Sequence, residues 1–189
     1  MSKRYEMRFA GSGGQGVILA SVIIAEAAVI AGLNAVQSQA YGPEARGGVS
    51  KAETIVSRGE IWYSKVTRPD FLLALTQASL DAYTKTLASG AVVMFDDSLR
   101  CPALPEGTSS FAVPILRTAK EVVGKAFTAN IVAIGAINAA LRLFDDACLL
   151  EAVRRHIPAG TEEINRKALA AGTALIAPEQ TAAFAVQIG

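Results

Sequence analysis

Strand-length apolar segments alternate with longer apolar segments along the first two thirds of the chain. Segments with the length and composition of strands span residues 5–11, 34–38, 70–75, 91–97 and 109–115. Segments typical of helices span residues 16–32, 78–88 and 116–123. This alternation predicts a parallel sheet that is covered by helices on both faces and joined by right-handed crossovers.

Two regions depart from this alternation. Apolar and polar side chains alternate with period two over residues 49–56, and another apolar segment follows the polar turn at residues 57–60, which predicts an inserted β-hairpin. From residue 130 onward the patterns are helical. The predicted fold is a three-layer, Rossmann-like α/β domain spanning residues 1–189, with a mostly parallel sheet, the inserted β-hairpin and C-terminal helices.

The charge balance excludes one class of function. Lys and Arg number 18 and Asp and Glu number 17, so the net charge is +1 and gives no electrostatic basis for binding nucleic acid. Hydrophobic residues make up 51% of the chain and charged residues 19%. This imbalance is typical of a subunit with a large interface, although an alanine-rich core would explain it equally well.

The cysteines and the apolar runs predict a cytoplasmic protein. The first nine residues contain no apolar core of a secretory signal, and no apolar run is long enough to span a membrane. Cys101 and Cys148 lie far apart outside any C-x-x-C pattern, which is typical of unpaired thiols in a reducing compartment. We therefore expect no disulfide, zinc site or iron–sulfur cluster within this chain.

A glycine-rich loop separates the first predicted strand from the first predicted helix. Gly11, Gly13 and Gly16 form a G-x-G-x-x-G pattern, in which backbone N–H groups at a helix N-terminus can hold a phosphate. A dinucleotide site also needs an acidic residue about 20 residues later to bind the ribose, and residues 34–42 contain none. This absence argues against a self-standing NAD enzyme. Phosphate capture and simple close packing of the glycines both remain open.

A second loop follows the strand predicted at residues 34–38. Its Gly-Pro turn at residues 42–43, together with Arg46, Gly47 and Gly48, has the composition of an anion cradle. The alternative is a surface ion pair between Arg46 and Glu44, which contributes little energy. Both loops follow strands that are predicted to be parallel, so we expect them to be neighbours at one edge of the sheet.

The two loops together resemble a known family. The sequence AGSGGQGVILA followed by QSQAYGPEARGGVSKAETIVS is similar to the gamma subunit of 2-oxoacid:ferredoxin oxidoreductases, the relatives of pyruvate:ferredoxin oxidoreductase. The similarity extends to about Gly172 and includes ANIVAIGAINA and INRKALAAG. It is greatest to the 2-oxoglutarate branch, with 2-oxoisovalerate and indolepyruvate oxidoreductases as alternatives within the family.

The resemblance implies a multi-subunit enzyme. The family converts a 2-oxoacid and coenzyme A to acyl-CoA and CO2 and reduces ferredoxin, using thiamine diphosphate, magnesium and iron–sulfur clusters held by alpha, beta and, in some members, delta subunits. This sequence lacks a G-D-G thiamine motif and cluster cysteines. The implied role is therefore structural, forming the channel for coenzyme A, with no catalytic or metal-binding residue of its own.

The two loops contain all the candidate cofactor-binding residues. These are Gly11, Gly13, Gly14, Gln15, Gly16, Tyr41, Gly42, Glu44, Arg46, Gly47 and Gly48. Gln15 and Tyr41 are assigned to subunit contact or to the channel lining. The alternative from a different functional class is a stand-alone nucleotide-binding or NAD(P)-dependent dehydrogenase domain that acts as a homodimer.

Other polar and aromatic residues have structural explanations. His156 is expected to interact with the dipole at a helix end. The acidic strand end at residues 96–98 is expected to be solvated or to cap a helix, and Asn130 to cap the helix that it begins. Trp62 and Tyr63 are expected to lie in an interface or to pack against the fold.

Overall fold

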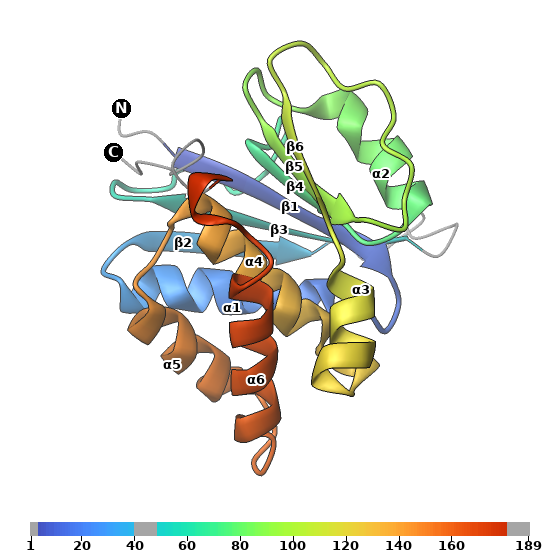
Figure 1. The fold of residues 1–189 in the computed structure, drawn as a ribbon. Coiled ribbons are helices and arrows are strands. Elements are labelled where there is room, and N and C mark those ends of the chain that lie inside the picture. Colours follow the sequence, from blue (N-terminus) through green and yellow to red (C-terminus); the bar gives the residue numbers. More distant parts are fainter. Residues whose placement is uncertain (1–3, 40–48, 181–189) are drawn as a thin grey trace.

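Residues 4–39 and 49–180 are described by a computed structural model of the protein, in which they form a sheet flanked by helices (Figure 1). The strands are β1 (Arg4–Ser12), β2 (Asn34–Gln39), β3 (Val49–Ser57), β4 (Phe71–Ala74), β5 (Val92–Asp96) and β6 (Ser109–Val113). The α-helices are α1 (Val17–Ile30), α2 (Gln77–Tyr83), α3 (Ile115–Arg117), α4 (Ala129–Leu141), α5 (Asp146–His156) and α6 (Glu162–Thr173). A π-helix, Thr118–Val123, continues α3.

The sheet has the strand order β2-β3-β1-β4-β5-β6. Strands β1, β4, β5 and β6 pair in parallel, while β3 runs antiparallel between β1 and β2. Because β3 opposes both of its neighbours, β2 runs in the same direction as β1. The predicted α/β fold with a mostly parallel sheet is confirmed.

The predicted hairpin around residues 57–60 is wrong. Residues 58–70 contain no strand, and β3 instead pairs with β1 on one side and β2 on the other. A strand over residues 61–66 would find no free edge on β3, because both edges are already hydrogen-bonded. The antiparallel element of the fold is therefore the β2–β3 pair.

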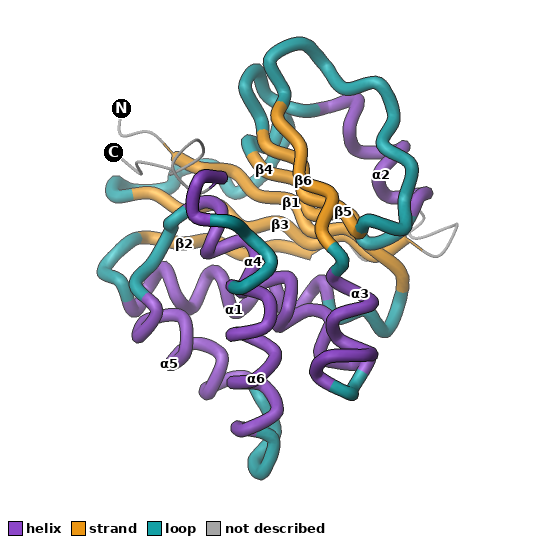
Figure 2. Tube along the Cα trace, viewed as in Figure 1, coloured by secondary structure: helices purple, strands orange, loops and turns teal. Residues whose placement is uncertain are grey.

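Helices cover both faces of the sheet unequally. Helices α1, α3, α4, α5 and α6 lie on one side of the sheet, and α2 alone lies on the other (Figure 2). The main hydrophobic core fills the side of α1 and α4, and a smaller cluster including Leu72, Leu80 and Val93 lies beneath α2. Helix α1 is apolar on most sides because β1, β2 and β3 cover one face and α5 packs on it, and α4 is apolar because it packs against α1, α3 and α6.

Two glycines permit the close packing of α4 on α6. A Cβ atom added to Gly172 would clash with the carbonyl group of Val132, and one added to Gly135 would clash with the carbonyl oxygen of Leu169. The helix backbones therefore meet with no side chain between them. These glycines lie in the AIGAINA and ALAAG segments of the sequence, so close helix packing explains both of them.

Candidate functional site

The glycine loop between β1 and α1 is closed by the side chain of Gln15. Its Oε1 accepts a hydrogen bond of 2.7 Å from the backbone N–H of Ser12, and its Nε2 donates one of 3.1 Å to the carbonyl of Leu75. Leu75 follows β4, which pairs with β1. The amide of Gln15 thus holds the loop against the carboxyl end of the neighbouring strand.

Close packing requires glycine at two positions of this loop. A Cβ on Gly11 would lie 2.5 Å from Oε1 of Gln15 and 3.0 Å from Val17. Gly16 is the N-cap of α1 with φ of 71°, and its Cβ would lie 2.8 Å from the side-chain amide of Asn130. Both glycines are thus explained by the fold itself.

The tip of the loop, in contrast, is open. Gly13 and Gly14 are exposed, and a Cβ at either would find no atom within 4 Å. Gly14 has φ of +87°, whereas the φ of Gly13 lies outside the left-handed region. The backbone of the tip is therefore accessible to a ligand, and packing does not explain the glycine at position 13.

The N-terminus of α4 lies beside the N-terminus of α1. Asn130 is only 4% exposed, and its side-chain amide lies against Gly16. It was expected to cap α4, but the N-cap is Thr128, because the helix begins one residue before Asn130. Asn130 is thus a buried polar group near the loop whose position the sequence alone did not predict.

The glycine loop and the adjacent N-termini of α1 and α4 form a corner of the fold, the glycine-loop corner, whose electrostatics favour an anion. Neither α1 nor α4 has an acidic residue in its first turn, and neither N-cap residue makes a side-chain capping bond. The positive ends of two helix dipoles therefore meet without an internal negative charge. Together with the open tip at Gly13 and Gly14, this arrangement can bind a phosphate or a carboxylate.

The second loop, with Tyr41, Gly42, Glu44, Arg46, Gly47 and Gly48, lies outside the described residues. The residues that border it are placed. Val49 pairs with Ser12 at the end of β1, and Gln39 pairs with Ala52 on the other side of β3. Both glycine-containing segments thus begin at one edge of the sheet, while the contact between the two loops stays a prediction.

Replacing Gln15 by Ala should destabilise the isolated chain by about 1–2 kcal/mol, because the Ser12 N–H and the Leu75 carbonyl both lose a part-buried partner. Urea unfolding followed by circular dichroism would measure the change. The matched control is Gln77→Ala, since the amide of Gln77 also makes hydrogen bonds but at an exposed site. Equal losses in the two variants would contradict the closing role of Gln15.

The acidic end of β5 has a structural role. Asp96 is 1% exposed, and its carboxylate accepts hydrogen bonds from the backbone N–H groups of Ser98 and Leu116. The helix that it caps is therefore α3, which follows β6. Asp97 pairs with Arg117 at 2.9 Å. Residues 4–39 and 49–180 contain no group of three or more His, Cys, Asp or Glu side chains that could hold a metal ion.

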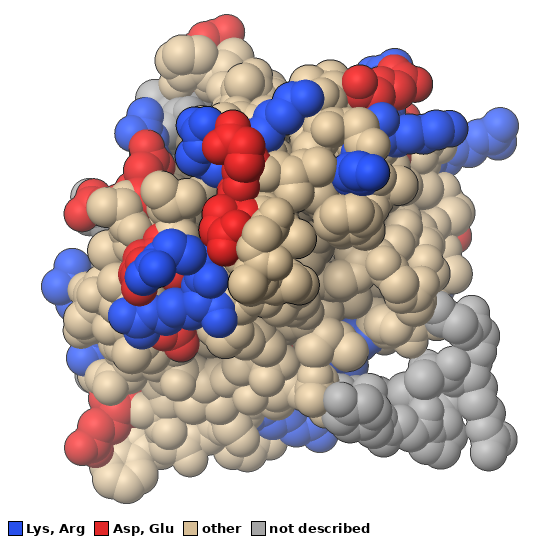
Figure 3. Space-filling model, turned by 90° about the horizontal axis from the view of Figure 1, so that it is seen from below, with Lys and Arg blue, Asp and Glu red and all other residues tan. Residues whose placement is uncertain are grey.

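His156 and the charged side chains of α5 and α6 form mixed local groups. His156 lies in the last turn of α5, with Nε2 3.8 Å from the carboxylate of Glu26. On the helix side of the molecule, positive and negative side chains lie next to each other (Figure 3). Glu151, for example, pairs with Arg154 and Arg155. This face presents no continuous basic patch for nucleic acid.

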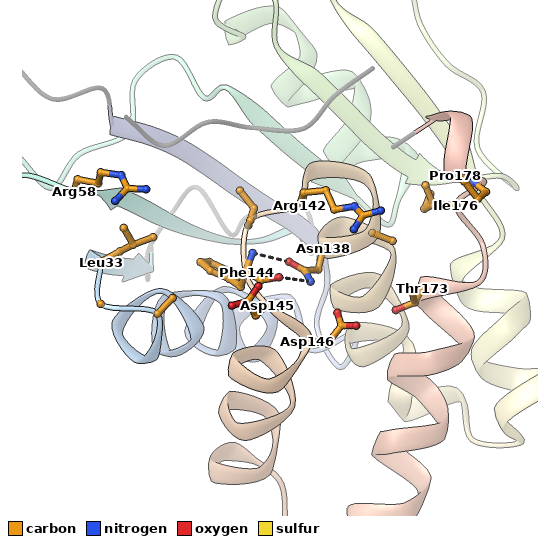
Figure 4. Close-up of a pocket in the computed structure, with 14 residues that line it drawn as sticks. Leu33, Arg58, Asn138, Arg142, Phe144, Asp145, Asp146, Thr173, Ile176 and Pro178 are labelled. Atoms are coloured by element: carbon orange, nitrogen blue, oxygen red, sulfur yellow. Dashed lines mark hydrogen bonds between the residues drawn. The ribbon is translucent and has the colours of Figure 1, made fainter. Parts of the chain in front are cut away.

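A hollow of about 730 Å³ lies at the opposite edge of the sheet (Figure 4). Asn138 forms part of its wall and exchanges two hydrogen bonds with the backbone of Phe144. The C-terminal ends of α1, α4 and α6 line it together with Asp145 and Asp146, as well as two arginines. Helix C-termini and carboxylates oppose anion binding, so the candidate phosphate site is the glycine-loop corner.

Comparison with known proteins returns one family. The family model described as pyruvate ferredoxin/flavodoxin oxidoreductase matches residues 6–175. The 2-oxoglutarate synthase subunit KorC of Methanothermobacter marburgensis is 42% identical over 180 residues, covering 92% of this chain and 97% of that protein. The ketoisovalerate oxidoreductase subunit VorA of the same organism is 31% identical, covering 90% of this chain but 36% of VorA.

Solved structures agree with this family. The gamma subunit of a keto/oxoacid ferredoxin oxidoreductase from Geobacter sulfurreducens is 44% identical, with a TM-score of 0.79 over 95% of this chain and 99% of that one. A 2-oxoglutarate:ferredoxin oxidoreductase from Magnetococcus marinus, with 2-oxoglutarate, coenzyme A and succinyl-CoA bound, has a TM-score of 0.84. The two sequences are 23% identical, and the alignment covers 100% of this chain and 34% of the Magnetococcus chain. This likeness shows a shared fold.

Proposed function

We propose, from the premise that this chain belongs to the pyruvate ferredoxin/flavodoxin oxidoreductase family, that it is the gamma subunit of a 2-oxoglutarate:ferredoxin oxidoreductase. The observation that carries the proposal is the 42% identity with KorC over almost the full length of both proteins. The resemblance of the sequence to this gamma subunit is confirmed. The relationship to VorA is weaker, at 31%, which favours 2-oxoglutarate over 2-oxoisovalerate as the substrate.

The donor groups of this chain do not fit the redox cofactors of such an enzyme. The sequence contains two cysteines, whereas a typical iron–sulfur cluster needs four thiolates. Both are free, one on an exposed loop and one on α5. Thiamine diphosphate, magnesium and iron–sulfur clusters therefore belong, in this proposal, to alpha, beta or delta subunits. Thiamine diphosphate would supply the electron sink for decarboxylation.

The part assigned to this chain is to shape the path of coenzyme A. Residues 1–189 act as one unit, and the glycine loop provides backbone N–H groups at the N-termini of α1 and α4 for an anionic portion of coenzyme A. The second loop adds Arg46 and its neighbouring glycines from the same edge of the sheet. The proposed contact residues are Gly11, Gly13, Gly14, Gln15, Gly16, Tyr41, Gly42, Glu44, Arg46, Gly47 and Gly48.

We place the complex in the cytoplasm, with ferredoxin as its electron acceptor. The two free thiols support a reducing compartment. Among the helices that the structure describes, none has the length and apolar character needed to cross a membrane.

Co-expression with candidate alpha and beta chains, followed by purification through a tag on this chain, tests the assignment. We expect a stable complex that oxidises 2-oxoglutarate with coenzyme A. It should reduce ferredoxin faster with 2-oxoglutarate than with 2-oxoisovalerate or indolepyruvate as the substrate. The assignment is wrong if no stable complex forms and the alpha and beta chains oxidise the oxoacid equally fast without this chain. Micromolar binding of NAD to the isolated chain, about 8 kcal/mol, would instead favour the stand-alone dehydrogenase.

Replacing Arg46 by Ala should leave the fold intact and raise the apparent KM for coenzyme A about tenfold, because a charge-assisted hydrogen bond to an anion contributes about 1.5–3 kcal/mol. Steady-state kinetics of the complex with coenzyme A as the varied substrate would measure the effect. The control is Arg154→Ala, at an exposed position on α5. Unchanged complex yield and unchanged KM for coenzyme A would remove Arg46 from the site.

A further inference from the structure

Residues 58–70 connect β3 to β4 and contain neither helix nor strand. Connections of this length without regular structure are uncommon in compact domains and are often functional. The segment lies on the side of β1 away from α1, since it contacts Arg4 and Arg8, which alternate along β1 with the core residues Tyr5, Met7 and Phe9.

The backbone of this segment is anchored from beneath by two arginines. Arg4 donates a hydrogen bond of 2.9 Å to the carbonyl of Tyr63, and Arg8 donates one of 3.2 Å to the carbonyl of Val66. Arg8 is only 5% exposed, and Glu53 neutralises its guanidinium at 2.7 Å. Releasing the segment would leave the buried N–H of Arg8 and the Val66 carbonyl without each other as partners, so these hydrogen bonds restrict the backbone of the segment.

The anchored segment carries two adjacent exposed aromatic residues. Trp62 is 87% exposed and Tyr63 is 55% exposed. Trp is on average among the most buried residue types, and Trp and Tyr are enriched among the residues that dominate binding energy at protein interfaces. A rigid backbone beneath them reduces the entropy lost on binding. The segment is therefore pre-organised for contact with another protein.

The charges around these aromatics indicate the chemistry of the partner. Lys65 and Arg68 are exposed and form no ion pair with any residue in the described ranges 4–39 and 49–180. The segment at residues 58–70 has three basic side chains and two acidic ones, and the carboxylate of Asp70 accepts a hydrogen bond from the backbone N–H of Glu6 on β1. A complementary surface would present an apolar recess with carboxylates at its rim.

We infer that Trp62 and Tyr63 insert into an apolar, acid-rimmed recess on another subunit of the same oxidoreductase. This inference rests on the proposed function and adds the surface through which the chain joins the complex. The lengths of the relatives favour a different subunit over a second copy. This chain corresponds to 36% of VorA and 34% of the Magnetococcus chain, so in those proteins the equivalent region is covalently joined to further parts of one polypeptide.

The test uses the variant Trp62→Ala/Tyr63→Ala within the full chain, co-expressed with the alpha and beta chains. We expect the dissociation constant for assembly to rise at least tenfold, while the melting temperature of the isolated chain is unchanged. Leu150→Ala is the matched control, because Leu150 is a 42% exposed apolar residue on α5, and it should assemble like the wild type. Lys65→Glu/Arg68→Glu should weaken assembly and reduce its sensitivity to salt.

The outcomes separate this inference from the proposed function. If the wild-type chain and the aromatic variant assemble equally well, Trp62 and Tyr63 do not form the docking surface. The inference is then wrong, and the proposed function is unaffected. Wild-type chain that forms no complex would overturn both. Light scattering of the isolated chain tests whether a second copy binds this surface instead. If the wild type is a dimer, the aromatic variant is a monomer and the yield of the complex is unchanged, the partner is a second copy and the inference is wrong.

Discussion

Gly172→Ala is expected to lower the free energy of unfolding by about 3 kcal/mol, although Ala normally stabilises a helix relative to Gly by about 0.5–1 kcal/mol. The reversal follows from the clash of the new Cβ with the carbonyl of Val132 on α4. Because backbone atoms on both sides meet, α6 must move away from α4 and its packing contacts are lost. For a chain of this size, the melting temperature should fall by about 6–12 °C.

Thermal unfolding by circular dichroism measures this change, and two variants make it interpretable. Gly135 on α4 faces the backbone of α6, so Gly135→Ala should lower the free energy of unfolding by a similar amount. Ala170 is exposed on α6, so Ala170→Gly should lower the free energy of unfolding only by the difference in helix propensity, about 1 kcal/mol. A Gly172→Ala protein as stable as the wild type would show that the two helices are not in backbone contact.

Gly13→Asp is expected to raise the KM for coenzyme A more than tenfold without lowering stability. Position 13 is exposed, its φ lies outside the left-handed region and a Cβ there meets no atom within 4 Å. The fold should therefore accept the side chain. A carboxylate about 5 Å from a bound phosphate costs about 3 kcal/mol at an effective dielectric constant of about 20, which exceeds the 1.4 kcal/mol of a tenfold change.

Kinetics of the assembled complex and calorimetric titration with coenzyme A would measure the loss of affinity. Gly13→Ala separates charge from size and should change the KM several-fold less. Ala147→Asp adds the same charge at an exposed position in the first turn of α5 and should leave the KM unchanged. An unaltered KM in Gly13→Asp, with a folded and assembled protein, would leave close packing as the only role of the glycine loop.

Most elements of the fold were predictable because their patterns are local. The strand β5, for example, was expected at residues 91–97 and is found at Val92–Asp96. The region expected to be helical from residue 130 onward contains α5 and α6 and all but the first residue of α4. The hairpin at residues 57–60 failed for a non-local reason. Period-two alternation indicates a strand with two different faces, but it does not identify the neighbouring strand. The pairing of β3 was decided by β1 and β2.

The candidate site was predictable in part for the same reason. The glycine spacing predicted a loop between a strand and a helix, and the structure has this loop between β1 and α1, while its binding of an anion stays a prediction. Its neighbour Asn130 lies more than a hundred residues later, and nothing in its local sequence separates a capping residue from one buried against Gly16. Asp96 likewise caps α3, which follows the next strand along the sheet.

The sequence by itself determined the alternation of strands and helices, the position of the glycine loop and the family, because each depends on residues close together in the chain. The tertiary structure alone decided which glycines are required by packing and which are open, since that distinction depends on atoms brought from other elements. Gly11, Gly16, Gly135 and Gly172 each face a neighbouring group, while Gly13 and Gly14 face none. A glycine carries no side chain to indicate its surroundings, so its role becomes visible only when the fold places those neighbours.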